Sequence, residues 1–199
     1  MAKILITGGT GFLGRNIIPS LIRRGHKVTN LSLKAYEDEN VQDIIFDAFK
    51  DDLQEALQGK DFEFVIHLAA FSTPKLATEY EKTMQLNVEF TEELLKSAQK
   101  FPSLKGFFFF STALVYSDKA PRPLKEDAPV AASEGDYYTE SKIKAEAVCR
   151  HFHEQGMPVK IWRLTNCFGP FQPHQPHPNL IPQVMAEAIA QKKVTILNG

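Results

Sequence analysis

The chain has 199 residues, with 23 lysines and arginines against 24 aspartates and glutamates and a formal net charge of −1. This length fits one globular domain or slightly more, at roughly 150 residues per domain. The balanced charge disfavours a nucleic-acid-binding protein, and no apolar run approaches the roughly 20 residues that cross a bilayer. The N-terminus lacks a signal-peptide pattern, and the two cysteines form no disulfide framework. We therefore expect a soluble, cytoplasmic protein without a membrane or nucleic-acid partner.

Strand-like and helical segments alternate along the chain. Short runs rich in β-branched and apolar residues predict strands over 3–7, 27–31, 43–46, 64–68, 106–110, 159–164 and 194–197. Apolar residues at helical spacing predict helices over 16–24, 51–57, 79–100, 137–154 and 183–191. This alternation predicts an α/β fold, a doubly wound Rossmann-type parallel sheet with helices on both faces.

A glycine-rich turn separates the first predicted strand from the first predicted helix. In Thr7–Gly14, Gly9, Gly11 and Gly14 satisfy the dinucleotide-binding fingerprint, and Gly8, Gly11 and Gly14 give its wider-spaced variant. Such a turn needs glycines for positive φ and for close approach of backbone N–H groups to a pyrophosphate, which the helix N-terminus also attracts. A simple tight turn is the alternative interpretation. The setting favours binding of NAD or NADP.

The choice between the two cofactors depends on the end of the second strand. An acidic residue about 20 positions beyond the glycines holds the ribose 2′-hydroxyl of NAD. This chain has Ser32 there, Lys34 nearby and no acid until Glu37. The choice therefore stays open, with a lean to NADP. Asp47, after the third strand, is placed to meet the adenine, although an exposed loop aspartate fits the pattern equally well.

Two further motifs carry groups suited to acid–base chemistry. Tyr138 and Lys142 lie four residues apart and share one face of a predicted helix, where a cation favours the phenolate. Tyr138 could then accept the proton of a substrate hydroxyl as a hydride leaves its carbon. Ser111 and Thr112 follow a strand, where a hydroxyl could hold the reacting oxygen; a turn or helix cap is the alternative.

Together these motifs resemble the extended short-chain dehydrogenases/reductases of the NAD-dependent epimerase/dehydratase family. The matching segments, in the family's order, are 8–14, 67–70, 86–88, 111–116, 138–142 and 163–170. The resemblance implies that Thr112, Tyr138 and Lys142 are catalytic and that Thr112 and Asn166 contact substrate. It also implies cofactor contacts at Gly8, Gly11, Phe12, Leu13, Gly14, Ser32, Asp47, Leu68, Ala69, Ala70, Asn87, Ser111, Tyr138, Lys142 and Leu164. For His67 a packed structural role is expected.

A boundary between two parts of the chain is predicted near the C-terminus. Gly169–Pro182 holds five of the twelve prolines and predicts a boundary. Residues 1–168 are expected to form the NAD(P)-binding domain, and residues 169–199 the beginning of a substrate-binding lobe that is truncated here. His174 and His177 are spaced like a metal pair but lack an acidic partner, so no metal site is predicted.

The resemblance implies an NAD(P)-dependent oxidoreductase, epimerase or dehydratase that acts on a nucleotide sugar by hydride transfer. The family also implies a homodimer. The alternatives are a non-catalytic NAD(P)-binding sensor, or a cofactor-binding fragment that is inactive without further sequence.

Overall fold

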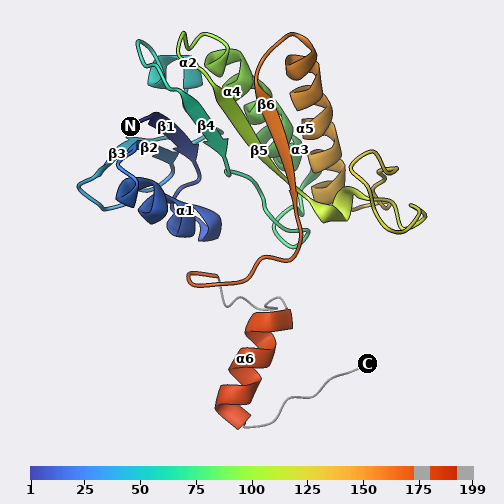
Figure 1. Ribbon diagram of the computed structural model, residues 1–199. Coiled ribbons are helices and arrows are strands. Elements are labelled where there is room, and N and C mark those ends of the chain that lie inside the picture. The colour runs from blue at the N-terminus through green and yellow to red at the C-terminus, as the bar shows by residue number, and fades with distance from the viewer. Residues whose placement is uncertain (173–179, 192–199) are drawn as a thin grey trace. The chain divides into compact units, whose positions relative to one another are not determined.

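In the computed structural model of the protein, six parallel strands form one sheet in the order β3-β2-β1-β4-β5-β6 (Figure 1). They are β1 Lys3–Thr7, β2 Lys27–Ser32, β3 Val41–Ile45, β4 Phe64–His67, β5 Gly106–Thr112 and β6 Val159–Leu164. β1 pairs with β2 on one side and with β4 on the other, so the strand order reverses beside β1. The predicted doubly wound Rossmann-type sheet is confirmed.

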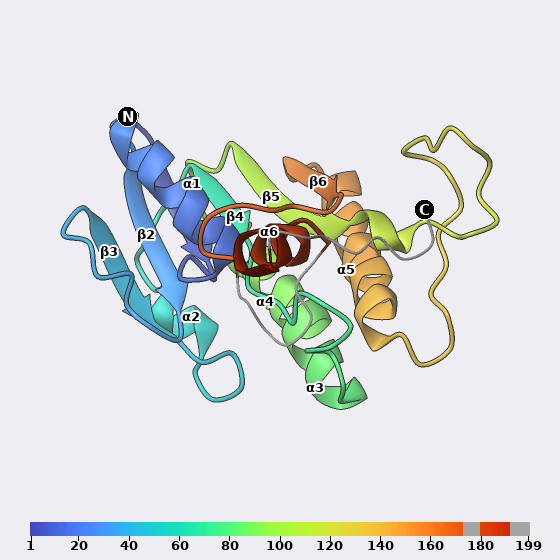
Figure 2. The same ribbon diagram turned by 90° about the horizontal axis from the view of Figure 1, so that it is seen from below.

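The described residues also form helices and helical turns. They are α1 Phe12–Arg23, α2 Leu53–Ala56, α3 Tyr80–Met84, the π-helical turn η1 Gln85–Glu89, α4 Phe90–Ala98, the 3-10 turn η2 Ala113–Val115, α5 Tyr137–Glu154 and α6 Leu180–Gln191. α1 lies on one face of the sheet, and α2, α4 and α5 lie on the other (Figure 2). Successive parallel strands joined by right-handed crossovers produce this division once the strand order reverses.

Several predicted elements differ in their bounds from those observed, by up to four residues at the start of α1, and two of the differences bear on the candidate site. The helix expected over 79–100 is divided into α3, η1 and α4, because the backbone widens into one π-helical turn around Asn87. Single π turns inside helices are frequent at functional sites. The strand expected over 106–110 continues to Thr112, because Ser111 and Thr112 pair with Arg163 and Leu164 of β6.

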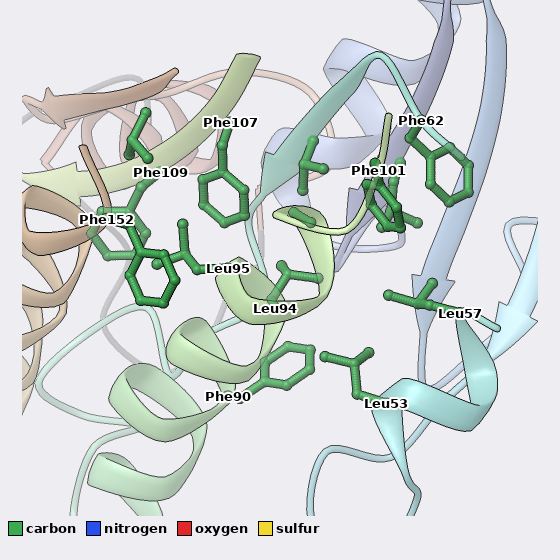
Figure 3. Close-up of a cluster of buried hydrophobic side chains, with 14 of the residues drawn as sticks. Leu53, Leu57, Phe62, Phe90, Leu94, Leu95, Phe101, Phe107, Phe109 and Phe152 are labelled. Carbon is green, nitrogen blue, oxygen red and sulfur yellow. The ribbon is translucent and has the colours of Figure 1, made fainter. Parts of the chain in front are cut away.

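The larger hydrophobic core lies between the sheet and the helices α2, α4 and α5. Phe107 and Phe109 point from β5 towards Leu94 and Leu95 of α4, while Phe152 approaches from α5 (Figure 3). These side chains are buried. At ~25 cal/mol per Å² of apolar surface, burial of such large side chains is what holds the helices on the sheet. The core thereby fixes where α5 stands relative to β5.

The opposite face of the sheet is less completely covered. A second core joins Ile4 and Ile6 of β1 to Ile18 of α1. Farther along, Trp162 of β6 lies 5.2 Å from the rings of both Phe108 and Phe110, and 49% of Trp162 is exposed. This aromatic cluster lies at the β6 edge of the sheet, since β6 pairs only with β5 among the described strands.

The structure describes residues 1–172 and 180–191, and contacts divide the chain into two units, Met1–Thr165 and Asn166–Gly199. The first unit holds the whole sheet. α6 belongs to the second, and the assignment of a substrate-binding lobe beginning at residue 169 stays a prediction. The strand expected over 194–197 and the histidines 174 and 177 lie outside the described residues. Among the helices described, none is both long and apolar enough to cross a membrane.

Candidate active site

Most of the predicted site positions lie at one edge of the sheet. The glycine turn follows β1, Ser32 ends β2, Asp47 follows β3, Leu68–Ala70 follow β4, and Ser111–Thr112 and Leu164 end β5 and β6. Because all strands are parallel, their carboxyl ends share this edge, which is where open α/β sheets bind ligands. The chain thus collects these residues from segments far apart in sequence.

The glycine turn is shaped for close backbone contact. Gly8 has φ of +67°, and a Cβ there would lie 2.9 Å from the backbone of Ala69. A Cβ at Gly14 would overlap the backbone of Gly9, so this glycine lets the helix pack on the turn. The first turn of α1 has neither a side-chain cap nor an acidic residue. Its N–H donors and positive helix end therefore fit a pyrophosphate, as NAD requires.

The end of β2 is tied to this turn by polar side chains. Ser32 Oγ lies 2.9 Å from Thr10 Oγ1, and the buried Asn30 accepts a 3.1 Å hydrogen bond from Gly9 N–H. Asn30 Nδ2 donates to Asp43 Oδ1 at 2.7 Å and to the carbonyl of Lys34 at 3.3 Å. These bonds hold the turn against β2. The sequence interpretation considered Ser32 but missed Asn30 and Asp43, which no spacing rule singles out.

Tyr138 and Thr112 meet across two elements. Both are buried, with Tyr138 in the first turn of α5 and Thr112 at the end of β5, and the Thr112 side chain acts by hydrogen bonding to lower the pKa of Tyr138. Thr112 Oγ1 also accepts from Leu114 N–H at 3.2 Å and caps η2, so the alternative interpretation of this hydroxyl also holds. Lys142, one turn beyond Tyr138, donates to the carbonyl of Phe110 at 2.9 Å. The predicted catalytic trio is therefore brought together.

Burial is the largest influence on the pKa values of Tyr138 and Lys142. It raises the pKa of Tyr138, the hydrogen bond with Thr112 acts in the opposite direction, and the charge of Asp136 adds to the rise. Burial lowers the pKa of Lys142 to about 8. In the chain alone, burial therefore outweighs the other influences on the Tyr138 pKa, and a bias towards the phenolate supplied by Lys142 and a bound nicotinamide stays a prediction.

His67, at the end of β4, is fully enclosed by hydroxyls and rings. Thr7 Oγ1 accepts the N–H groups of Leu68 and Ala69, so it donates its own hydrogen to His67 Nδ1 at 2.6 Å. His67 Nε2 then carries the proton and donates to Thr91 Oγ1 at 2.9 Å. Burial lowers the pKa of His67 to about 3, and the Lys142 charge adds to this. The ring is neutral and structural, as expected.

The same polar chain continues to the catalytic helix through the π-helical turn. Thr91 donates to the carbonyl of Asn87 at 2.8 Å. The Asn87 side chain binds both backbone groups of Phe71 and donates to Ser141 Oγ at 2.9 Å, and Ser141 donates to the carbonyl of Tyr138 at 2.7 Å. Asn87 therefore organises the site through hydrogen bonds, while its contact with a cofactor stays a prediction.

Three further predicted positions have other partners or belong to the second unit. Asp47 forms a 2.8 Å ion pair with Lys50, and Asp47 Oδ1 caps the N–H of Phe49. Ser111 Oγ donates to Glu146 at 2.6 Å instead of pointing along the edge. Asn166 belongs to the second unit.

Glu146 is a buried group that the sequence interpretation missed. It lies four residues beyond Lys142 and eight beyond Tyr138, so it shares their helix face, and that spacing was available as a signal. Its partner Arg163 lies on β6, and no local pattern links the two residues.

Comparison with known proteins places the chain in a family. Residues 4–199 match the NAD dependent epimerase/dehydratase family. The chain belongs to this family. A UDP-N-acetyl-alpha-D-glucosaminuronate decarboxylase of Bacillus cytotoxicus is 32% identical over 94% of this chain. A bovine sterol-4-alpha-carboxylate 3-dehydrogenase (decarboxylating) is 27% identical over 99% of it. The chain spans 61% and 54% of these two relatives.

Solved structures of the family agree with the fold. A UDP-N-acetylglucosamine 4-epimerase from Methanobrevibacter ruminantium M1, in complex with UDP-N-acetylmuramic acid, superposes with a TM-score of 0.84 at 28% identity. The superposition includes 100% of this chain and 66% of that epimerase chain. A UDP-glucuronic acid 4-epimerase from Bacillus cereus in complex with NAD gives a TM-score of 0.72 at 26% identity, covering 85% of this chain and 58% of that one. The comparisons favour NAD and do not support the lean to NADP.

Proposed function

We propose that this protein binds NAD at the glycine turn and acts on a nucleotide sugar by reversible hydride transfer. The observation that carries this proposal is that the buried side chains of Tyr138, Thr112 and Lys142 come together from α5 and β5, with Thr112 acting on the pKa of Tyr138 and Lys142 one helical turn away. These groups lie at the edge where the parallel strands end. Relatives that act on UDP sugars support the substrate class.

The residues have separate roles in this proposal. Thr112 holds the oxygen of a substrate hydroxyl beside Tyr138, whose phenolic oxygen takes the proton as the carbon–oxygen bond becomes a carbonyl. Lys142 supplies positive charge that favours the phenolate once its ammonium turns towards the reacting groups. Bound NAD would accept the hydride. Return of hydride and proton from the opposite face of the carbonyl would give the epimeric hydroxyl. Loss of water from the ketone before the hydride returns would give a net dehydration, and hydride transfer from separately supplied NADH would give a net reduction.

Binding and turnover together test the proposal. Calorimetry with NAD and NADP on the 199-residue chain should give tighter binding of NAD. A panel of UDP and dTDP sugars, with a 3β-hydroxysteroid acid included because of the bovine relative, should show turnover of a nucleotide sugar. Turnover of the steroid alone would contradict the substrate class. NAD binding without any turnover, together with redox-dependent binding of a protein partner, would favour the sensor.

Replacement of Tyr138 by Phe isolates the acid–base step. The change removes only the hydroxyl, so we expect turnover to fall by about a hundredfold or more while NAD affinity changes less than about twofold. Steady-state kinetics and calorimetry on the same preparations measure both. Tyr137→Phe, one residue earlier, is the matched control and should retain turnover. Equal activity of the two variants would contradict the assignment of Tyr138.

Cytoplasmic localisation and a homodimer stay predictions of the resemblance. Sedimentation of the purified chain would measure its oligomeric state.

A further inference from the structure

The carboxylate of Glu146 is the centre of a buried hydrogen-bond cluster. Ser111 Oγ and Arg163 Nε donate to Oε1 at 2.6 and 2.9 Å. Arg163 Nη2 and Arg150 Nη1 donate to Oε2 at 2.7 and 3.1 Å. The Glu146 side chain has no exposed surface. Each carboxylate oxygen thus accepts two bonds, which is the arrangement that a buried charge requires.

The cluster joins the elements that carry the catalytic trio. Glu146 stands on α5, on the face that carries Tyr138 and Lys142. Its partner Ser111 directly precedes Thr112 on β5, and Arg163 pairs with Ser111 in the β5–β6 ladder. A displacement of α5 along β5 would therefore stretch the bond between Glu146 and Ser111.

Arg163 extends the same cluster beyond the sheet. Its guanidinium lies 4.6 Å from the centre of the Tyr116 ring, and its Nη1 donates to the carbonyl of Glu126 at 2.9 Å. The segment that follows Thr112 is thus fastened to β6. A planar guanidinium with bonds in fixed directions can do this, whereas lysine cannot replace it without losing contacts.

We propose that Glu146 is a positioning residue, which holds the Thr112 end of β5 and the Tyr138 face of α5 at the separation that proton transfer needs. The proposal rests on the proposed function for the roles of Thr112 and Tyr138. Apolar contacts between α5 and β5 fix their packing but not a sub-ångström separation of two hydroxyls. Directed, charge-assisted bonds define such a separation, and an error of about 1 Å can cost about a hundredfold in rate.

The pKa of Tyr138 distinguishes two possible roles of Glu146, positioning of Thr112 and a direct effect of its negative charge. Thr112 from β5 and Asp136 before α5 act on this phenol, Thr112 lowering its pKa and Asp136 raising it. On its own helix face, the charged residues Lys142 and Glu146 follow four and eight residues later. If Glu146 holds Thr112 in place, loss of the carboxylate weakens the bond to Tyr138 and raises the pKa of Tyr138. If Glu146 acts only through its negative charge, its removal lowers that pKa.

The experiment uses the full chain and the variants Glu146→Gln and Arg150→Gln. Arg150 binds the same carboxylate but is the more exposed of its two arginines, with 46% of its side chain accessible against 13% for Arg163. Ultraviolet difference titration against Tyr138→Phe reports the Tyr138 midpoint in each protein. We expect it to rise in Glu146→Gln and to stay unchanged in Arg150→Gln. A fall or no shift in Glu146→Gln, or an equal rise in Arg150→Gln, would overturn the proposal.

A double variant keeps the test valid if Glu146→Gln fails to fold. Glu146→Gln/Arg163→Met removes the unpaired guanidinium along with the carboxylate, so we expect it to be more stable than Glu146→Gln alone, and circular dichroism checks its fold. We expect it to show the raised Tyr138 midpoint, and turnover reduced about tenfold to a hundredfold with the KM for NAD within about twofold. If this variant had wild-type turnover and an unshifted Tyr138 midpoint, the cluster would stabilise the fold only, and the proposal would be overturned. Lack of turnover in the wild type would count against the proposed function, while the titration would still decide the role of Glu146.

Discussion

Gly8 combines a left-handed backbone with a neighbour that leaves no room for a side chain. Gly25, after α1, has a similar φ of +77°, but a Cβ there would meet nothing within 4 Å. Gly25→Ala should therefore cost only the conformational penalty, about 1 kcal/mol. Gly8→Ala should cost about 2–3 kcal/mol, because the backbone of Ala69 must also move. Urea unfolding measures both, and calorimetry should show weaker NAD binding for Gly8→Ala alone; equal losses would contradict the close approach.

His67 makes the stability of the protein depend on pH. Its pKa falls from 6.5 to about 3 on folding, so the unfolded chain binds one more proton between these values. This contribution to stability is complete above pH ~6.5 and is lost as the pH falls towards 3, by a few kcal/mol in total. The wild-type free energy of unfolding should therefore fall steeply from pH 6.5 to 4.

His67→Gln should flatten that acid slope although it is less stable at pH 7, because a buried hydrogen-bonded ring is lost. Urea unfolding at pH 7, 5.5 and 4 measures the slopes. His151→Gln, on the exposed surface of α5, is the control and should keep the wild-type slope. An unchanged slope in His67→Gln would mean that the pKa of His67 is the same in the folded and unfolded chains, which would contradict the prediction.

At the scale of single elements, the N-terminus of α5 links helix stability to the acidity of Tyr138. Asp136 caps the helix by accepting the N–H of Thr139 at 3.0 Å, and its charge raises the pKa of Tyr138. Asp136→Asn keeps the cap and removes the charge, so we expect a lower Tyr138 pKa at unchanged stability. Asp136→Ala removes both and should also cost about 1 kcal/mol. Ultraviolet titration and urea unfolding check the pair; a Tyr138 pKa that both variants leave unchanged would exclude the charge effect.

The elements differ in how far the sequence could predict them. α5 was predicted with its observed bounds, because an uninterrupted helical pattern begins at Tyr137 and ends before Gly156. The π-helical turn at Asn87 was not, since one extra residue in a turn hardly alters apolar periodicity. It depends on the bonds from Asn87 to Phe71 and Ser141, which only the folded chain brings together.

The site shows the same division between local and distant contacts. Tyr138, Lys142 and the glycine turn were predictable because each is defined by short spacing and a known physical requirement. The partners of Glu146 and Asn30 come from other strands, so their pairing is decided by sheet order and register. Which residues each strand brings together at the edge is therefore information that a single sequence does not contain.

For the molecule as a whole, the first unit has what an independent domain needs. Met1–Thr165 contains the six strands and the two hydrophobic cores of the described residues. We expect a chain of residues 1–165 to unfold cooperatively and to bind NAD within about threefold of the 199-residue affinity, because the glycine turn and its neighbours are all retained. Calorimetry and urea unfolding of both chains measure this. Loss of binding on truncation would mean that the second unit takes part in holding the cofactor.

Trp162 is the single tryptophan of the chain, and it stands half-exposed on β6, three residues before the first unit ends. Indole emission shifts to shorter wavelengths when water is removed from the ring. The protein consequently contains its own fluorophore at the edge of the sheet, without labelling and without interference from a second indole. Binding of any molecule or segment over the aromatic cluster of β5 and β6 can therefore be followed by the emission wavelength of Trp162.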